Sequence, residues 1–334
     1  MKRKENLPAN DVLSRTDYSP FMARETKPEA LQRPRDYSPF GTPVAAPRAE
    51  AGLYLVATPI GNLGDISLRA LELLAAADII ACEDTRVTRK LTERYGIRTP
   101  LMPYHEHNAG EARPKILARL AEGQAVALVS DAGTPMISDP GYRLVRATVE
   151  AGHSVTALPG ASAVMAALNL AGLPTDRFFF EGFLPPKQAG RQKRIAELNA
   201  IPATLVLFES GPRLAAALAD LAAGLGPRAA AVCRELTKLH EEVRRGDLTD
   251  LAQQYADGAE IRGEIVIVVA PPADDETSAG DLDDMLRRAL ARVSVKDAVG
   301  EVALATGRPR RDVYKRALEL AKDSDQEGSD NGAA

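Results

Sequence analysis

Acidic and basic residues stand together directly after the apolar run DIIAC. Glu83 and Asp84 come first, and Arg86, Arg89 and Lys90 follow closely. A carboxylate can remove a proton from a weakly acidic hydroxyl, and neighbouring cations can hold an anionic ligand. The same order also suits the start of a helix, because acids in a first turn and cations later in the helix complement its dipole. From these residues alone, a helix start is the simpler interpretation.

A second stretch, VSDAGTPMISDPG (129–141), concentrates glycine, proline and aspartate after the apolar run AVAL. Glycine and proline keep side chains away from a ligand, so the backbone amides of such a turn can approach it closely. Similar loops follow other apolar runs, and ligands of open α/β sheets bind where such strand ends meet. The candidate loops are 58–65, 83–90, 130–135, 159–163 and 209–213.

Several common types of site are not indicated. The chain has no GxxxxGK[ST] phosphate loop and no GxSxG nucleophile motif, and GNLG lacks the spacing of a dinucleotide fingerprint. His105 and His107 form the only close histidine pair in the sequence, and no third ligand follows at a suitable spacing. We therefore expect no metal centre.

The elements that must position these loops alternate between short apolar runs and helical patterns. Ser67 is a candidate N-cap for the first helix, and Asp139 is a candidate N-cap for the helix after the glycine-rich stretch, with Pro140 in its first position and Gly152 at its end. This alternation predicts a parallel sheet covered on both faces. Strands are expected at 53–57, 78–82, 125–130 and 153–159, and helices at 67–77, 110–122, 140–152 and 160–172.

A second domain is expected after the aromatic stretch GLPTDRFFFEGFLPPK (172–187), which breaks this rhythm. Its alternation is less regular, so we expect a mixed sheet with strands at 203–210, 229–236 and 263–270 and a helix from Pro212. The domains predicted are a disordered tail (1–50), an N-terminal α/β domain (51–171), a C-terminal α/β domain (172–272), a helix-turn-helix-like module (281–322) and a second disordered tail (323–334).

The first tail contains the pentapeptide DYSPF twice, at 17–21 and at 36–40. The repeat is either a docking motif or a chance repetition in a segment without periodicity.

Composition limits the classes of protein. The chain has 334 residues, a net charge of −4 and two cysteines, each within an apolar run. No segment approaches the roughly 20 apolar residues of a membrane span, and the first residues lack the apolar core of a secretory signal. We expect a cytoplasmic protein with reduced thiols that has no membrane partner.

Four stretches carry a resemblance to a known family. LYLVATPIGNLGDISLRA, CEDTRVTRKL, SDAGTPMISDPG and LPGASAVMAAL occur in this order. They resemble the 16S rRNA 2′-O-methyltransferase branch of the tetrapyrrole methylase superfamily, and the resemblance covers about 52–270. It implies two α/β domains of the class III methyltransferase type, with S-adenosyl-L-methionine in the cleft between them. It also implies a homodimer whose substrate is a cytidine ribose in the decoding region of 16S rRNA, within the small ribosomal subunit.

The resemblance also implies particular cofactor contacts. Gly133, Thr134 and Pro135 match a Gly-Asp-Pro-like turn of the superfamily, but Thr134 replaces its acidic member. The polar contact is then made either by Asp131 or by a backbone amide. The cofactor-binding residues implied are Pro59, Asp131, Gly133, Thr134, Pro135, Ile137, Ser162, Ala163, Leu207, Phe208, Cys233 and Glu264.

Finally, the resemblance assigns catalysis to Glu83, Asp84 and Arg86, because EDTR lies within a family motif. Two basic stretches, 185–195 and 305–318, could bind RNA phosphates, although solvated helical faces explain the same charges. The RNA-binding residues expected are Arg89, Lys90, Lys187, Arg191, Lys193 and Arg194. Two alternatives remain. One is a tetrapyrrole methylase that acts on a corrin or porphyrin precursor, and the other is a non-catalytic ribosome-binding protein.

Overall fold

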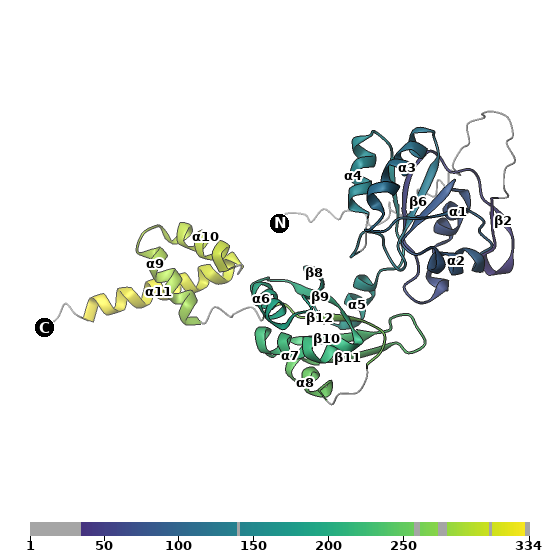
Figure 1. The fold of residues 1–334 in the computed structure, drawn as a ribbon. Coiled ribbons are helices and arrows are strands. Elements are labelled where there is room, and N and C mark those ends of the chain that lie inside the picture. Colours follow the sequence, from purple (N-terminus) through teal and green to yellow (C-terminus); the bar gives the residue numbers. More distant parts are fainter. Residues whose placement is uncertain (1–34, 139–140, 257–260, 273–278, 307–308, 331–334) are drawn as a thin grey trace.

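The computed structural model of the chain describes residues 35–138, 141–256, 261–272, 279–306 and 309–330. Two α/β domains lie side by side, and a small helical module follows them (Figure 1). Nearly every strand and helix expected from the sequence is present in these ranges.

The first domain is built on a five-stranded parallel sheet with the order β5-β4-β6-β3-β7. Its central strands are buried along their whole length, as expected for a sheet covered on both faces. The strands are β3 (Gly52–Val56), β4 (Ile79–Cys82), β5 (Leu101–Pro103), β6 (Ala125–Val129) and β7 (Val155–Leu158). The helices are α1 (Leu68–Ala76), α2 (Thr85–Arg94), α3 (Ala109–Ala121), α4 (Tyr142–Glu150) and α5 (Ala163–Ala171).

The predicted caps of these helices have different outcomes. Ser67 accepts a hydrogen bond from the backbone N–H of Ala70 and caps α1 as expected. Asp139 and Pro140 lie outside the described residues. The helix after them begins at Tyr142 with Gly141 at its N-cap, two residues later than predicted. Gly141 has a φ of 153°, a backbone conformation that glycine adopts readily.

The second domain has a mixed sheet, as predicted, with the order β11-β10-β12-β9-β8. The phenylalanine-rich crossing itself forms β8 (Phe178–Phe183), which pairs with β9 (Thr204–Ser210) in parallel. The other strands, β10 (Ala229–Arg234), β11 (Glu242–Asp247) and β12 (Glu264–Val269), pair antiparallel. The helices are α6 (Gln188–Leu198), α7 (Leu214–Leu225), which follows a short 3-10 turn, and α8 (Leu248–Gln254). The sequence analysis missed β8, which it took for the crossing between the domains. It also missed α6, β11 and α8, whose polar residues hide the period.

Helix α5 joins the two domains. It follows β7 in the chain, yet its apolar side chains pack against β10 and β12 of the second sheet. Val164, Ala167 and Leu168 lie in one buried cluster with Cys233 and Val266. The predicted boundary at 171/172 therefore follows a helix that already packs as part of the second domain.

Residues 35–50 are not disordered, so the predicted tail over 1–50 is wrong for this part. They form β1 (Asp36–Tyr37), a 3-10 turn and β2 (Val44–Ala45). Arg35 contacts the carboxylate of Asp78 at 2.8 Å and also donates to the carbonyl of Ala76, near the end of α1. Tyr37 is 8% exposed and packs in the core beside α1. The second DYSPF copy docks on the domain, whereas the first copy lies outside the described residues.

The C-terminal module consists of α9 (Ala279–Leu290), α10 (Val295–Thr306) and α11 (Arg310–Asp330) around a core of its own. These helices fit the expected helix-turn-helix-like module, but α9 begins two residues before its predicted start at 281. Helix α11 continues to Asp330, so the predicted second tail is wrong for most of its length.

Candidate active site

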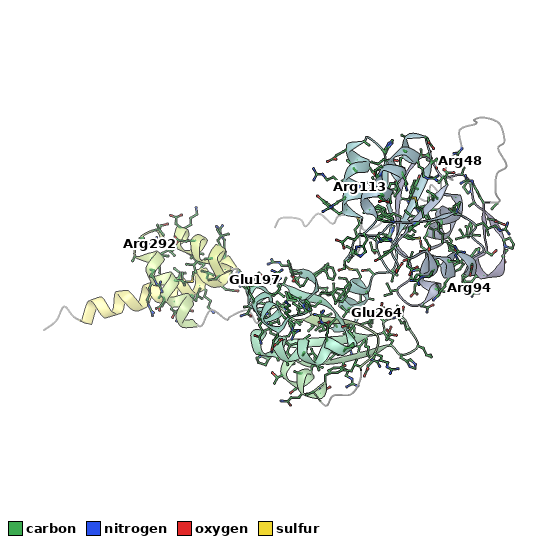
Figure 2. The ribbon with its side chains drawn as sticks, viewed as in Figure 1. Arg48, Arg94, Arg113, Glu197, Glu264 and Arg292 are labelled. Carbon is green, nitrogen blue, oxygen red and sulfur yellow. The ribbon has the colours of Figure 1, made fainter. Side chains whose placement is uncertain are left out.

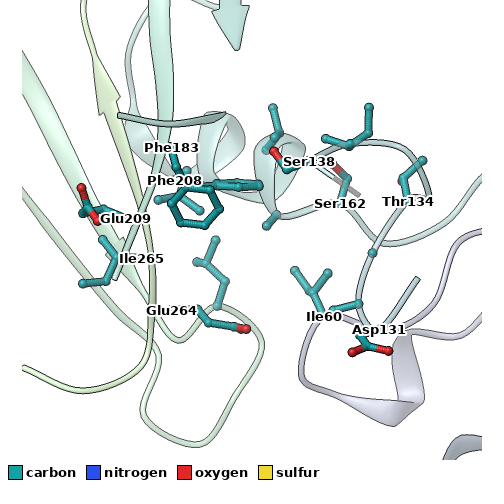
Figure 3. A pocket seen from close by; sticks show the side chains of 17 residues that line it. Ile60, Asp131, Thr134, Ser138, Ser162, Phe183, Phe208, Glu209, Glu264 and Ile265 are labelled. Atoms are coloured by element: carbon teal, nitrogen blue, oxygen red, sulfur yellow. The ribbon is translucent and has the colours of Figure 1, made fainter. Parts of the chain in front are cut away.

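A pocket lies where the two domains meet (Figure 3). One wall comes from the carboxyl ends of β3, β6 and β7 in the first domain, and the other comes from β8, β9 and β12 in the second. Phe208 faces the first domain and makes edge-to-face contacts with the rings of Phe180 and Phe183. Such an aromatic wall suits a flat ring of a ligand.

The turn after β6 forms the polar wall. Gly133 and Thr58 exchange two backbone hydrogen bonds of 2.9 and 3.0 Å, which tie this turn to the loop after β3. The hydroxyl of Thr134 donates to the carbonyl of Ala161 at 3.2 Å, which ties it to the loop after β7. Gly133 has a φ of 76°, a conformation that costs a residue with a side chain about 1–2 kcal/mol.

Two other residues of this turn, Met136 and Ser138, also have positive φ values, 71° and 67°. Strained conformations of non-glycine residues cluster at ligand clamps and active sites. Ser138 lines the pocket, and Ser162, in the neighbouring loop after β7, caps α5 through a hydrogen bond from the backbone N–H of Met165. The turn is therefore held in one shape by both of its neighbouring loops, which prepares its backbone for a ligand.

Most of the expected cofactor-binding residues line this pocket. They are Asp131, Gly133, Thr134, Ile137, Ser162, Ala163, Phe208 and Glu264. The sequence analysis missed other lining residues, most of which are apolar side chains that carry no chemical signal. These are Ile60, Ala132, Ser138, Val164, Phe183, Glu209, Leu236, Ile265 and Val266.

Four expected residues, Pro59, Pro135, Leu207 and Cys233, do not line the pocket. Leu207 is fully buried on the opposite face of β9, because successive side chains of a strand alternate between its faces. Cys233 is fully buried against α5, and burial raises the pKa of its thiol to about 11. These residues support the pocket wall from behind.

Asp84, expected to act in catalysis, caps α2. Its carboxylate accepts the backbone N–H of Arg86 at 2.8 Å and contacts the Arg86 side chain at 2.6 Å. The side-chain hydrogen bond from Arg86 lowers the pKa of Asp84 to about 2. A carboxylate held so acidic is a poor proton acceptor near neutral pH. These contacts agree with the helix start that the residues alone suggested.

Asp131 connects this loop to the pocket. One of its carboxylate oxygens accepts the backbone N–H of Asp84 at 2.9 Å, while the residue itself lines the cleft. In Figure 3, Asp131 lies beside Ile60 at the first-domain edge of the pocket. Asp131, in the turn after β6, therefore lines the pocket and also holds the loop after β4 through this hydrogen bond.

The basic residues expected to bind RNA differ in their surroundings. Arg89 and Lys90 are exposed on α2. The predicted basic loop at 187–194 is instead the start of α6, which exposes Lys187 and Lys193. The same helix buries Arg191, which is 5% exposed.

Two arginines of α6 already have carboxylate partners. Arg191 lies 2.6 Å from Asp220, and Arg194 lies 2.6 Å from Glu181 and 2.7 Å from Glu197. Both charges are therefore paired within the domain, and the expected role of these two arginines in binding RNA stays a prediction.

Comparisons with known proteins agree with this architecture. A family model described as "Tetrapyrrole (Corrin/Porphyrin) Methylases" matches residues 52–252. The chain belongs to the tetrapyrrole methylase family. A second model, described as "RsmI C-terminal HTH domain", matches residues 276–321. The family and the fold expected from the sequence are thus confirmed.

Two curated relatives carry the name "Ribosomal RNA small subunit methyltransferase I". The chain is 52% identical to the one from Mesorhizobium japonicum over 288 residues, 86% of this chain and 98% of that protein. It is also 52% identical to the one from Erythrobacter litoralis over 269 residues, 80% of this chain and 95% of that protein. A solved cobalt precorrin-4 methyltransferase shares the fold, with a TM-score of 0.51 at 18% identity over 65% of this chain and 94% of that one.

Within the described ranges, no group of three or more His, Cys, Asp or Glu side chains is arranged to hold a metal ion. None of the described helices is both long and apolar enough to cross a membrane.

Proposed function

We propose that this chain methylates the ribose 2′-hydroxyl of a cytidine in the decoding region of 16S rRNA, with S-adenosylmethionine as the methyl donor. The observation that carries this proposal is the similarity to proteins named ribosomal RNA small subunit methyltransferase over nearly their whole length. The pocket between the two sheets supports it, because its preformed turn and aromatic wall suit a nucleoside cofactor.

The cofactor's sulfonium supplies an activated methyl group when bound. The residues of the chain then have two tasks, which are to hold the acceptor hydroxyl in line and to remove its proton. The turn at 131–138 and the aromatic wall with Phe208 bind and orient the cofactor, since they line opposite sides of the pocket. The position of the pocket between the two domains limits the access of water to it.

Asp131 is the proton acceptor in this proposal, and Glu83, Asp84 and Arg86 position it. Asp131 lines the pocket and is held by the N–H of Asp84. The Asp84 carboxylate is engaged by Arg86 and has a pKa near 2, so it fixes the loop rather than taking a proton. Glu83, the residue before it, is only partly exposed.

The rRNA is held in this proposal by cations on several elements. Arg89 and Lys90 on α2, together with Lys187 and Lys193 on α6, are exposed and available to phosphates. The helix-turn-helix module adds Arg310 and Arg311, both exposed at the start of α11. The protein works in the cytoplasm as a homodimer, and light scattering of the purified protein checks the dimer.

The deciding experiment maps rRNA methylation by mass spectrometry in cells with and without the gene. We expect one ribose methyl on a cytidine of the decoding region to disappear with the gene and to return with the wild-type copy. An unchanged methylation map would overturn the proposed function. Calorimetry with S-adenosylmethionine separates a methyltransferase from a non-catalytic ribosome-binding protein, and assays with porphyrin or corrin precursors test a small-molecule methylase.

A further inference from the structure

A cluster of basic side chains lies at the same sheet edge as the pocket but outside it. Its centre is Tyr104, which follows β5 and is only 2% exposed. Arg113 of α3 and Arg143 of α4 both lie close enough to influence the ionisation of the Tyr104 hydroxyl. Their sequence neighbours Ala112 and Leu144 pack with Tyr104 in one buried cluster. His105 and His107 stand beside it, with ring centroids 6.1 Å apart.

The cluster contains polar atoms without a partner. The Nδ1 atom of His105 and the Nε atom of Arg113 are both buried, and neither has a hydrogen-bond partner in the described part of the chain. Within the same ranges, neither Arg113 nor Arg143 has a carboxylate at ion-pair distance. Glu106 and Glu111 are nearby in the sequence, but both are exposed. Buried polar atoms normally have hydrogen-bond partners, so the lack of partners for these two atoms calls for an explanation.

The placement of Arg143 is also unfavourable without a ligand, because Arg143 is the second residue of α4. Arg113 lies one turn further along its own helix, as the fifth residue of α3. Cations near the start of a helix oppose its dipole, whereas an anion there is stabilised. An anion bound between the two side chains would offset this repulsion and would supply the missing hydrogen-bond acceptors.

The sheet order relates this cluster to the reaction. Strand β5 lies next to β4, and β4 lies next to β6, whose turn forms the polar wall of the pocket. Since neighbouring strands are about 4.8 Å apart, the ends of β5 and β6 are separated by roughly 10 Å. Arg113, a residue of α3, lies at the edge of the first domain (Figure 2). A polynucleotide that enters the pocket over the Glu83–Arg86 loop would therefore reach this cluster next.

We propose that Arg113, Arg143 and His105 form a binding site for a backbone phosphate of the RNA substrate. The inference rests on the proposed function, since it takes the polymer that crosses the pocket to be RNA. The phosphate belongs to a nucleotide that neighbours the methylated one, because the cluster lies two strands away from the pocket wall. The site positions the RNA without reading its sequence.

The test compares binding of purified small ribosomal subunits by wild-type protein, Arg143→Gln and Arg113→Gln/Arg143→Gln. The matched control is Arg146→Gln, since Arg146 is also on α4 but is paired with Glu150 at 2.7 Å. We expect the double variant to lose about tenfold or more in affinity, and its salt dependence to flatten by about one to two released ions. The control and the cofactor affinity should not change.

Arg143→Gln keeps the test decisive if loss of the Arg113 contact to Tyr104 impairs folding, because Arg143 is exposed. Unchanged subunit binding by a folded Arg143→Gln variant, with an unchanged salt slope, would disprove the phosphate site. Titration with inorganic phosphate is a second arm. If free phosphate binds to the cluster but the variants bind subunits normally, the site serves a free anion and the inference is wrong. Failure of the wild-type protein to methylate subunits would contradict the proposed function alone, because the binding measurement does not depend on turnover.

Discussion

Gly133 is the residue on which the shape of the cofactor pocket depends most directly. Its φ of 76° favours glycine, and a Cβ atom there would meet the Ile60 side chain at 3.2 Å. Gly133→Val should therefore weaken binding of S-adenosylmethionine at least tenfold, about 1.4 kcal/mol, and should also lower stability by about 1–2 kcal/mol. Calorimetry and thermal unfolding measure the two effects.

Gly172→Val is the matched control for this prediction. Gly172 has a similar φ of 71° at the end of α5, but a Cβ atom there would meet no other atom within 4 Å, and the residue does not line the pocket. We expect this variant to lose stability and to keep its cofactor affinity. Equal cofactor affinity in folded Gly133→Val protein would place the cofactor elsewhere.

Substitutions of Asp131 and Asp84 distinguish the proton acceptor from the residue that positions it. Asp131→Asn should lower the single-turnover rate of methyl transfer by about 10²-fold or more, because the amide cannot accept the ribose proton. Asp84→Asn should have a smaller effect, because asparagine also caps helices well. The rates of both variants are measured by single-turnover methylation at saturating cofactor and subunit. Glu83→Gln is measured in the same assay.

The opposite order of effects would return the role of proton acceptor to Asp84, as the family motif implied. A loss of cofactor affinity in Asp131→Asn, without a loss of rate at saturation, would instead make Asp131 a cofactor-binding residue. In either case the pKa near 2 keeps the Asp84 carboxylate ionised at neutral pH, so its contact with Arg86 persists in the assay.

Helix α6 carries basic residues with two different roles, one in stability and one in binding RNA. Arg191→Leu should destabilise the protein by about 3–5 kcal/mol, because it leaves the buried Asp220 carboxylate without its cation. Lys187→Gln/Lys193→Gln should leave stability unchanged and flatten the salt dependence of subunit binding. Chemical denaturation and binding at several salt concentrations check these results.

The carboxylate of Asp220 adds a pH dependence to this element. Burial works against its ionisation, but hydrogen bonds from Gln192 and Arg191 hold its pKa below the ordinary value. A group with a lowered folded-state pKa contributes stability above its unfolded pKa and loses it as the pH falls. The loss of stability in Arg191→Leu should therefore be largest near neutral pH and should diminish in acid. A difference that stays constant down to strongly acidic pH would argue against this ion pair as the cause.

The N-terminal segment links the element scale to the whole molecule. Tyr37→Ala should lower the free energy of unfolding by about 3 kcal/mol, because it removes a buried aromatic ring from the core beside α1. Phe40→Ala, in the same DYSPF copy, should have little effect, since Phe40 is 98% exposed. Thermal unfolding of the two variants decides whether docking of this copy supports the first domain. Equal stability of both variants would mean that the contacts of Tyr37 add nothing.

At the scale of the whole molecule, the sequence determined the family, the order of the elements and most of the pocket. Local chemistry marked the turns, since strand ends with Gly, Pro and Asp indicate ligand-binding loops whatever the distant contacts are. The resemblance of four stretches to a known family gave the family and the individual pocket residues. Ser67 capped its helix, and Gly133 and Thr134 lie in the pocket wall, as their sequence neighbours indicated.

Only the tertiary structure decided which charges are free to act and which segments are ordered. Arg191 and Lys193 stand two residues apart in one basic run, yet Asp220, distant in sequence, pairs with the first inside the domain, while the second stays exposed. Asp84 and Asp131 could not be ranked from their types, because an arginine neighbour and a backbone N–H set their roles. The 35–50 segment has no period of its own, and it is ordered by contacts with α1 that no local pattern encodes.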